Sequence, residues 1–177
     1  MATTAPRLPS AYPSALVEVG ELSDGARVRL RPIRPDDALR LERLLHRLSP
    51  LTRYRRFFTP VPRPDLDVID RLVHVDYTDR LAMIAEVDDE VIGVARYDRV
   101  TADEAEVAVV VEDAWQGRGV GTRLLWRLSA AARERGLQAF VAEVQGENRP
   151  MMGLLRVLSD DVRWELSDGA YHVRIGL

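Results

Sequence analysis

The chain has 177 residues and a formal net charge of −3, and it contains no cysteine and three histidines. Its length suits one domain that buries a core without disulfides, and its acidic balance argues against a nucleic-acid partner. The missing cysteines exclude thiolate nucleophiles and Cys-based metal sites, and the histidines lack metal-ligand spacing, so no metal is expected.

The composition sets further limits on chemistry and location. All basic charge is arginine, because the sequence holds no lysine. A Walker A phosphate loop and a Schiff-base mechanism are therefore excluded. No apolar run approaches the roughly 20 residues of a membrane span, and the first residues do not resemble a secretory signal. We therefore expect a cytoplasmic protein with no membrane partner.

The first part of the chain reads as an extension, a strand and three helices. Residues 1–24 are expected to form an N-terminal extension, because prolines lie among small residues there. Alternating apolar and charged residues predict a strand at 26–33. Apolar residues at helical spacing, with proline or serine at the first positions, predict the helices. They are expected over 35–48, 49–56 and 65–73, with Pro60, Pro62 and Pro64 breaking the chain.

The rest of the chain changes period. Strands are predicted at 81–87 and 91–97, joined by the hairpin signal Asp88-Asp89-Glu90, and at 104–112. A long helix over 119–135, ended by Gly136, precedes a further strand, a helix and a closing hairpin. These last elements are expected at 139–144, 150–158, 162–166 and 171–177. The order predicts one α/β domain over residues 25–177, with a mixed, mostly antiparallel central sheet flanked by helices.

One segment carries chemistry. The residues Gln116-Gly117-Arg118-Gly119-Val120-Gly121-Thr122 lie between an apolar strand and the long helix. Glycines allow backbone N–H groups to approach an anion, and a helix N-terminus favours phosphate. A Rossmann fingerprint would need glycine at position 122, and a P-loop would need a lysine.

The segment resembles the pyrophosphate loop Q/R-x-x-G-x-G/A of the GNAT superfamily of acyltransferases, and Gln116, Gly119 and Gly121 occupy its defined positions. The resemblance covers about residues 27–177. It implies that acetyl-CoA is the co-substrate and that the loop 116–122 holds its pyrophosphate. It also implies that the backbone around Val109 and Val111 holds the pantetheine, and that a strand N–H polarises the thioester carbonyl. Asn148, the one asparagine of the chain, is implied as a further cofactor contact, and a capping role is its alternative.

Three other segments are similar to the Pat-type protein lysine acetyltransferases of bacteria. These are Val28–Asp37, Leu48–Phe57 and Glu143–Met151. The similarity implies a protein lysine as the amine acceptor. The sequence differs from that family at Leu158-Ser159-Asp160, where a Gly-Phe pair is usual, and it lacks the fused regulatory or ligase-like domain that such enzymes often carry.

The transfer needs a general base, because a lysine ammonium must lose a proton before it attacks a thioester. Glu106 is the first candidate: apolar neighbours on its strand are expected to raise its pKa, and the resemblance implies a catalytic glutamate on this strand. Glu143, a water chain or another group are the alternatives for the base, and a place on the solvated face of an alternating strand is the alternative for Glu106. Tyr97 and Tyr171 could act as general acids for the leaving thiolate, but nothing in their positions along the sequence favours that role.

Arg53, Arg55 and Arg56 form a basic cluster in the second helix, with three possible uses: an acidic protein surface, the ribose phosphate of CoA, or a solvated helix face. Three functions are possible for the chain as a whole: acetylation of protein lysines, acetylation of a small amine, or binding of acyl-CoA as a non-catalytic sensor. Glu106 favours the two enzymes over the sensor.

Overall fold

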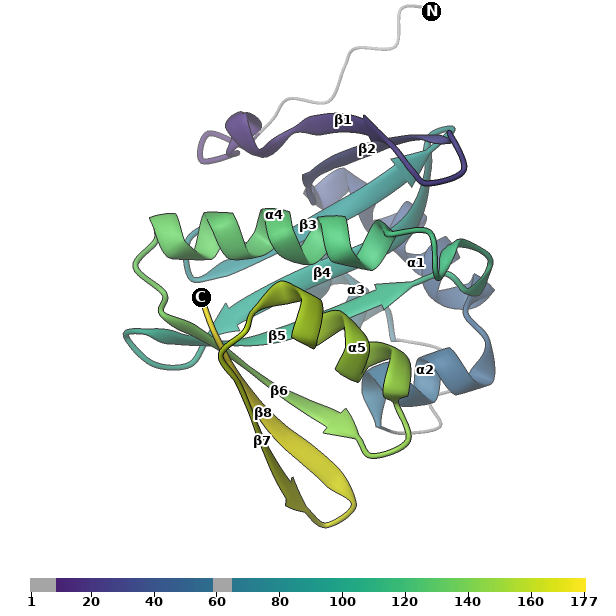
Figure 1. Ribbon diagram of the computed structural model, residues 1–177. Coiled ribbons are helices and arrows are strands. Elements are labelled where there is room, and N and C mark those ends of the chain that lie inside the picture. Colours follow the sequence, from purple (N-terminus) through teal and green to yellow (C-terminus); the bar gives the residue numbers. More distant parts are fainter. Residues whose placement is uncertain (1–8, 59–64) are drawn as a thin grey trace, which may run out of the picture.

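The computed structural model describes residues 9–58 and 65–177, so the tip of the expected extension and the break at Pro60, Pro62 and Pro64 lie outside the described residues. The described strands form one eight-stranded sheet in the order β1-β2-β3-β4-β5-β6-β8-β7. Every neighbouring pair is antiparallel except β5 and β6, which are parallel. The predicted mixed, mostly antiparallel sheet is thereby confirmed (Figure 1).

The elements follow the predicted order. The strands are β1 (Glu18–Glu21), β2 (Arg27–Pro32), β3 (Arg80–Val87), β4 (Glu90–Arg99), β5 (Glu104–Val111), β6 (Ala139–Gln145), β7 (Val162–Ser167) and β8 (Ala170–Gly176). The helices are α1 (Ala38–Arg47), α2 (Pro50–Phe57), α3 (Leu66–Val73), α4 (Val120–Glu134) and α5 (Arg149–Leu158).

Among the described strands, β1 is the one that the sequence pattern did not predict. It lies inside residues 1–24, the expected extension, and pairs with β2 from Glu18↔Leu30 to Glu21↔Arg27. Arginines of α4 fix the same segment from the other side: the Arg127 guanidinium donates to the carbonyls of Ala15 and Leu16, and that of Arg123 donates to the carbonyl of Glu21. Residues 15–21 of the expected extension therefore pack on the domain.

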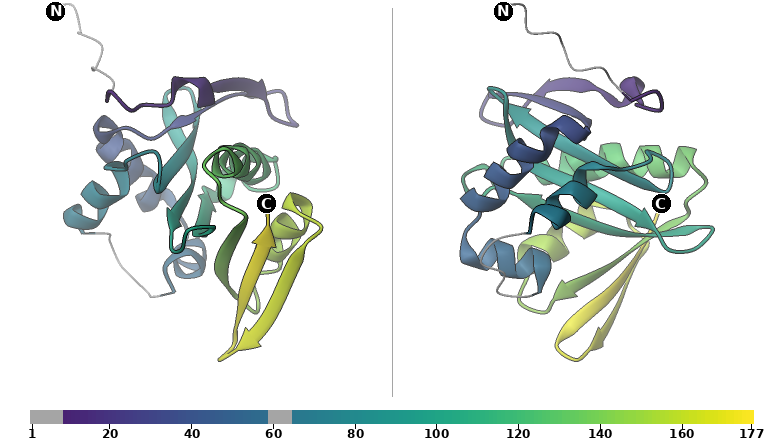
Figure 2. Two further views of the ribbon diagram at one scale, coloured as in Figure 1. Left: turned by 90° about the vertical axis from the view of Figure 1, so that its left-hand side faces the viewer. Right: turned by 180° about the vertical axis from the view of Figure 1, so that it is seen from behind.

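Helices cover both faces of the sheet. Helices α4 and α5 lie on the face seen in Figure 1, and α1, α2 and α3 lie behind it, as the rear view in Figure 2 shows. One buried cluster packs α4 against β3, β4 and β5, and a second packs α1 and α3 against the opposite face. Apolar residues on both faces of the central strands explain why these strands read as nearly continuous hydrophobic runs.

The parallel pair β5–β6 is short and then opens. The strands pair only at Glu104↔Ala139, Ala105↔Phe140 and Glu106↔Val141. Beyond Glu106, β5 stays paired with β4, from Val107↔Tyr97 to Val111↔Gly93, and β6 stays paired with β8 as far as Gln145↔Ala170. Figure 1 shows the two strands separating below α5. We call this opening the wedge; it leaves the β6-facing edge of residues 107–111 without a strand partner in the described chain.

Candidate active site in the wedge

The loop before α4 is shaped by glycine. Gly117 and Gly119 have φ angles of +74° and +87°, a region that favours glycine. Gly119 is the N-cap of α4 and supplies no side chain to the first-turn amides. The N–H groups of Val120, Gly121 and Thr122 therefore have no intrahelical acceptor, so they could donate to an anion.

Gly121 serves a different purpose. It lies inside the first turn of α4, and a Cβ atom there would come within 3.2 Å of Leu154 Cδ2 on α5. The missing side chain lets α5 approach the start of α4 closely, which closes one wall of the site.

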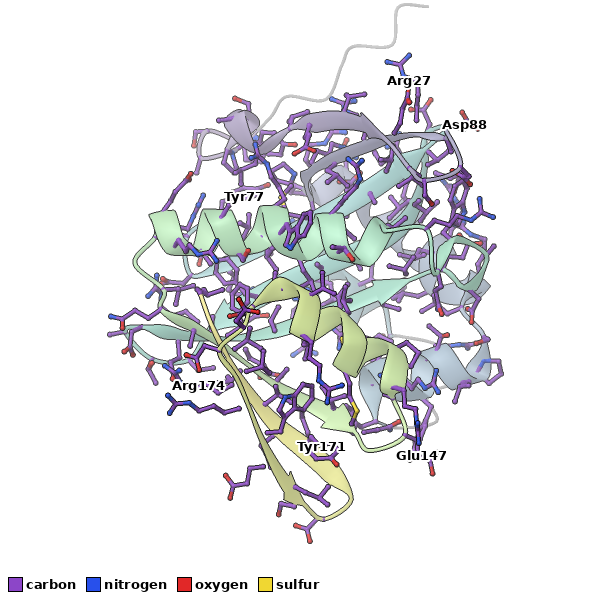
Figure 3. All side chains as sticks on the ribbon, in the orientation of Figure 1. Arg27, Tyr77, Asp88, Glu147, Tyr171 and Arg174 are labelled. Carbon is purple, nitrogen blue, oxygen red and sulfur yellow. The ribbon has the colours of Figure 1, made fainter. Side chains whose placement is uncertain are left out.

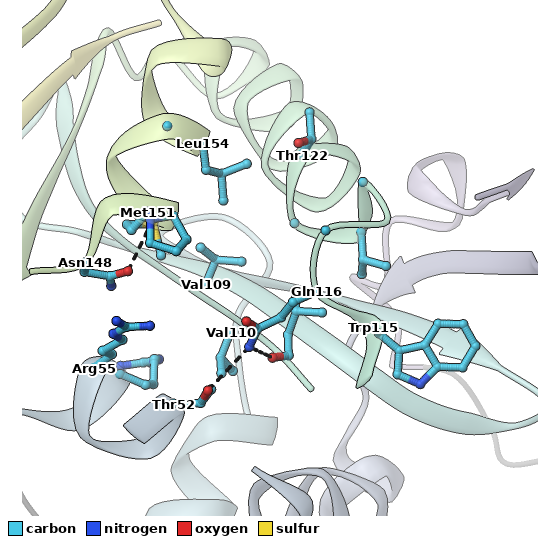
Figure 4. A pocket seen from close by; sticks show the side chains of 18 of the residues that line it. Thr52, Arg55, Val109, Val110, Trp115, Gln116, Thr122, Asn148, Met151 and Leu154 are labelled. Atoms are coloured by element: carbon cyan, nitrogen blue, oxygen red, sulfur yellow. Dashed lines mark hydrogen bonds between the residues drawn. The ribbon is translucent and has the colours of Figure 1, made fainter. Parts of the chain in front are cut away.

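A cleft of about 500 Å³ opens in front of the loop. Figure 4 shows its walls: the loop and α4 on one side, α5 above, and α2 below. Nine of the ten residues predicted to bind the cofactor line it: Val109, Val111, Gln116, Gly117, Gly119, Val120, Gly121, Thr122 and Asn148.

Arg118 is the tenth residue, and it does not line the cleft. Its guanidinium pairs with Asp24 in the β1–β2 turn and lies 4.8 Å from the ring centroid of Trp115. Asp24, in turn, has its pKa lowered by the backbone N–H of Ala26 and by Arg118. The partner that directs Arg118 away from the cleft thus comes from the segment before residue 25.

Asp113, which lies just before the loop 116–122, connects that loop to helix α2. The backbone N–H and hydroxyl of Ser49 donate to its carboxylate at 2.9 and 2.7 Å, and the Thr52 hydroxyl donates at 2.7 Å. Burial opposes ionisation of Asp113, but these hydrogen bonds outweigh it and lower its pKa. Gln116 extends the connection, because its side-chain amide donates to the carbonyl of Val111 at 3.0 Å and approaches the Thr52 hydroxyl at 3.4 Å.

Asn148 caps α5 and also borders the cleft. It is buried at the N-cap of α5, where Oδ1 accepts from the N–H of Met151 at 3.3 Å. Its amide nitrogen forms no hydrogen bond with a described residue, and the side chain borders the cleft (Figure 4). Capping therefore uses the oxygen and leaves the donor for a ligand.

The cleft continues into the wedge. A second cavity of about 270 Å³ lies between β5 and β6, and it shares Arg55, Arg56, Val109, Asn148 and Met151 with the cleft. Its walls also include the two candidate bases, Glu106 on β5 and Glu143 on β6. A thioester held along β5 would lie beside both carboxylates.

The sequence pattern had led us to expect apolar side chains around Glu106, but the structure does not enclose it in them. Its side chain is exposed, because alternation places Val107 and Val109 on the α4 face of β5 and Glu106 on the opposite face. Glu143 is exposed as well. The carboxylates are thus open to an incoming amine.

The two tyrosines considered as general acids pack elsewhere. Tyr97 is fully buried, its hydroxyl donates to the carbonyl of Thr78 at 2.8 Å, and burial raises its pKa to about 12. Tyr171 packs against Trp164 with ring centroids 5.8 Å apart, on the β7–β8 hairpin (Figure 3). Neither lines the cleft or the wedge cavity.

Beyond the wedge, the sheet presents an open groove. A hollow of about 690 Å³ runs over β5, β6, β8 and β7, and Glu106 and Glu143 belong to both the groove and the wedge cavity. The rest of its lining mixes polar side chains (Arg163, Glu165, His172 and Arg174) with apolar ones (Val100, Val141, Ala142, Trp164 and Val173). Arg174, labelled in Figure 3, forms an ion pair with Glu104 at 2.7 Å.

Comparison with known proteins agrees with this geometry. The model of the acetyltransferase (GNAT) family matches residues 48–158. The chain belongs to the GNAT family. It is therefore an N-acetyltransferase that uses acetyl-CoA.

Individual relatives support the GNAT assignment. The chain is 31% identical over 141 residues to an acetyltransferase of Pseudomonas aeruginosa, covering 77% of this chain and 76% of that protein. It is 36% identical over 133 residues to the acetyltransferase Pat of Mycolicibacterium smegmatis, covering 71% of this chain and 39% of Pat. The GNAT domain of S. lividans PAT superposes with a TM-score of 0.88 at 37% identity, covering 94% of this chain and 99% of that one.

Several residues of this GNAT site were not predicted from the sequence. Helix α5 contributes Pro150, Met151, Gly153, Leu154 and Val157, and α2 contributes Thr52. The apolar face of α5 was visible as a periodic pattern, but nothing in that pattern tells a core-facing stripe from one that lines a cleft. Among residues 9–58 and 65–177, no group of three or more acidic or histidine side chains is arranged to hold a metal ion, and no helix is long and apolar enough to cross a membrane.

Proposed function

We propose that this GNAT enzyme transfers the acetyl group of acetyl-CoA to the ε-amine of a lysine in a protein acceptor. The attack is direct, with Glu106 as the general base. One observation carries the proposal: Glu106 stands at the boundary between the wedge cavity, which continues the cofactor cleft, and the groove that is open to the surface. A base at that boundary meets the amine as it reaches the thioester.

Glu106 accepts a proton from the ammonium, whose unperturbed pKa is near 10.4. The neutral amine attacks the carbonyl carbon and forms the C–N bond. The C–S bond then breaks, and the attacking nitrogen gives up its second proton to the departing sulfur or to solvent, so that CoA leaves as its thiol or thiolate. A backbone N–H on the open edge of residues 107–111 stabilises the oxyanion.

The loop 116–122 is proposed to hold the pyrophosphate, with the unpaired amides at the start of α4 as its donors. The pantetheine would lie along Val109 and Val111, and the amide nitrogen of Asn148 would donate to it. Arg118 reaches the phosphates only if it leaves Asp24.

The open groove favours a protein acceptor over a small amine. A small amine would be better held by an enclosed pocket, whereas the groove is open, extends over several strands and is lined by both charged and apolar side chains. The similarity to the Pat-type enzymes points in the same direction. We place the reaction in the cytoplasm, as the sequence predicts.

The test is an acetyl-CoA turnover assay against a panel of lysine-containing proteins and small amines, read by release of free CoA. Transfer to protein lysines with little transfer to small amines is the expected result. Transfer to small amines alone would favour the second function. Acetyl-CoA binding without any turnover would favour the sensor.

A further inference from the structure

Two arginines at the end of α2 face the wedge without a bonding partner. Arg55 and Arg56 line both the cofactor cleft and the wedge cavity. Within residues 9–58 and 65–177, neither forms a hydrogen bond or an ion pair; Arg56 lies over the ring of Phe57, 4.9 Å from its centroid. Figure 4 shows Arg55 across the cleft from Asn148. The arginines of α1 behave differently, since Arg40, Arg43 and Arg47 each form ion pairs.

Arg56 lies at the thioester end of the site rather than at the phosphate end. Burial lowers its pKa to about 10, repulsion from Arg96 adds to that effect, and Glu106 and Asp98 oppose it. These three neighbours belong to β4 and to the start of β5. The pyrophosphate loop follows the other end of β5, so Arg56 is badly placed to bind the phosphates of CoA.

The acids around these arginines divide into paired and unpaired groups. Asp98 is occupied, because Arg80 and Arg96 donate to its carboxylate at 2.7 and 3.1 Å. Glu106 and Glu143 form no hydrogen bond with any residue of the described chain. The wedge cavity therefore presents two carboxylates and two guanidinium groups, all without hydrogen bonds.

We infer that Arg55 and Arg56 bind a carboxylate that the acceptor carries close to its reactive amine, while Glu106 and Glu143 receive the ammonium. The inference rests on the proposed function and adds a specificity rule to it. A guanidinium group matches a carboxylate through two parallel N–H···O bonds, and a partly buried cation without a partner is costly to keep. The carboxylate comes from an acidic residue beside the acceptor lysine or from the α-carboxylate of an amino acid.

The experiment measures binding and turnover with matched acceptors. The first pair consists of end-blocked peptides that contain one lysine flanked by glutamate or by glutamine. The second pair is lysine and lysinamide. Calorimetry gives the affinity of each acceptor for the CoA-saturated protein, and initial rates with acetyl-CoA give turnover. The proteins are the wild type, Arg55→Gln, Arg56→Gln, Arg56→Lys and the control Arg133→Gln, whose side chain is exposed on α4.

The wild type should bind the glutamate peptide roughly tenfold or more tightly than the glutamine peptide, as expected for a hydrogen-bonded charge pair. The ratio should approach one in Arg55→Gln and Arg56→Gln, recover in part in Arg56→Lys, and stay unchanged in Arg133→Gln. If only lysine and lysinamide are discriminated, the carboxylate is that of an amino acid, and the inference still holds.

Other outcomes separate the inference from the proposed function. Equal affinities in the wild type, or a preference that survives both glutamine variants, would overturn the inference even if lysines are acetylated. A preference that depends on Arg55 and Arg56 without any acetyl transfer would leave the carboxylate site standing and reject the proposed activity. No measurable binding of any acceptor would also overturn the inference.

Discussion

At the scale of single residues, the position of Glu106 decides how the reaction starts. Glu106→Gln keeps the size of the side chain but cannot accept a proton. The kcat should therefore fall by about 10²–10⁴-fold, while the affinity for acetyl-CoA stays near that of the wild type. The deficit should shrink as pH rises, because more of the acceptor amine is then already neutral. Steady-state rates between pH 7 and 10, with calorimetry for acetyl-CoA, measure both quantities.

Glu143→Gln is the matched comparison, since Glu143 lines the same cavity from β6 and is proposed to help receive the ammonium but not to take its proton. It should leave kcat within a few-fold of the wild type. If Glu143→Gln shows the large loss and Glu106→Gln does not, the base is Glu143.

Gly119 tests the phosphate loop. Its φ of +87° is unfavourable for a β-branched residue, so valine there would distort the turn that leads into the α4 amides. Gly119→Val should abolish measurable acetyl-CoA binding. Gly136→Val is a close control, because Gly136 has a φ of +79° and equally open surroundings at the other end of α4. Both variants should lose stability, by about 1–3 kcal/mol, yet only Gly119→Val should lose the cofactor. Unchanged acetyl-CoA affinity in folded Gly119→Val would reject the loop assignment.

At the scale of elements, a buried charge network joins β2, β3 and the start of α1. The Arg31 guanidinium donates to both Asp37 oxygens at 2.7 and 2.6 Å and to both Glu86 oxygens at 3.0 and 2.5 Å. Burial alone would raise the pKa of Asp37, but Arg31 and the backbone N–H of Arg34 outweigh it and lower that pKa below 3.8. A lowered pKa in the folded state means that Asp37 stabilises the fold above pH 4 and loses that contribution as pH falls through its folded-state pKa.

Asp37→Asn should therefore lower the free energy of unfolding at neutral pH by about 3 kcal/mol, because Arg31 keeps only part of its buried partners. The variant should also lack part of the acid-dependent loss of stability seen in the wild type. Urea titrations at pH 7 and at pH 3 measure both effects. Asp36→Asn is the control: Asp36 is 41% exposed, and its variant should stay within about 0.5 kcal/mol of the wild type. Equal stability of the two variants would contradict this role of the network.

The elements with strong periodicity were the ones that the sequence predicted. The apolar stripes of α1 and α4 and the nearly continuous apolar runs of β3 and β4 are local patterns, so they can be read without tertiary structure. Strand β1 was missed because it has four residues and is defined by pairing with the edge of β2. The wedge was also beyond a local pattern, because it depends on where the pairing of β5 with β6 stops.

In the site, too, features made by neighbouring residues were predicted and features made by distant residues were not. The loop 116–122 was predictable because its glycines and the helix that follows are adjacent in sequence. The partner of Arg118 was not, since Asp24 lies 94 positions earlier. The sequence left open whether Glu106 is exposed, because alternating apolar neighbours on one strand do not show which face of the sheet is covered.

At the scale of the whole molecule, the absence of lysine predicts how the enzyme treats itself. No internal ε-amine exists to be acetylated. After incubation with acetyl-CoA, any self-acetylation should therefore be confined to the N-terminal amine. Peptide mass spectrometry of the incubated protein checks this. An acetyl group on an internal peptide would show that the enzyme uses an acceptor other than an amine.

Because the enzyme contains no lysine, every acetyl-lysine in a reaction mixture must come from the acceptor, and this makes the decisive measurement unambiguous. Acetyl-CoA and purified candidate proteins are incubated with the enzyme, and free CoA and acetyl-lysine are counted in the same samples. We predict that the two rise together in equal amounts and that both fall by about 10²–10⁴-fold with Glu106→Gln. CoA release without acetyl-lysine, or equal acetyl-lysine with folded Glu106→Gln, would contradict lysine acetylation through the wedge.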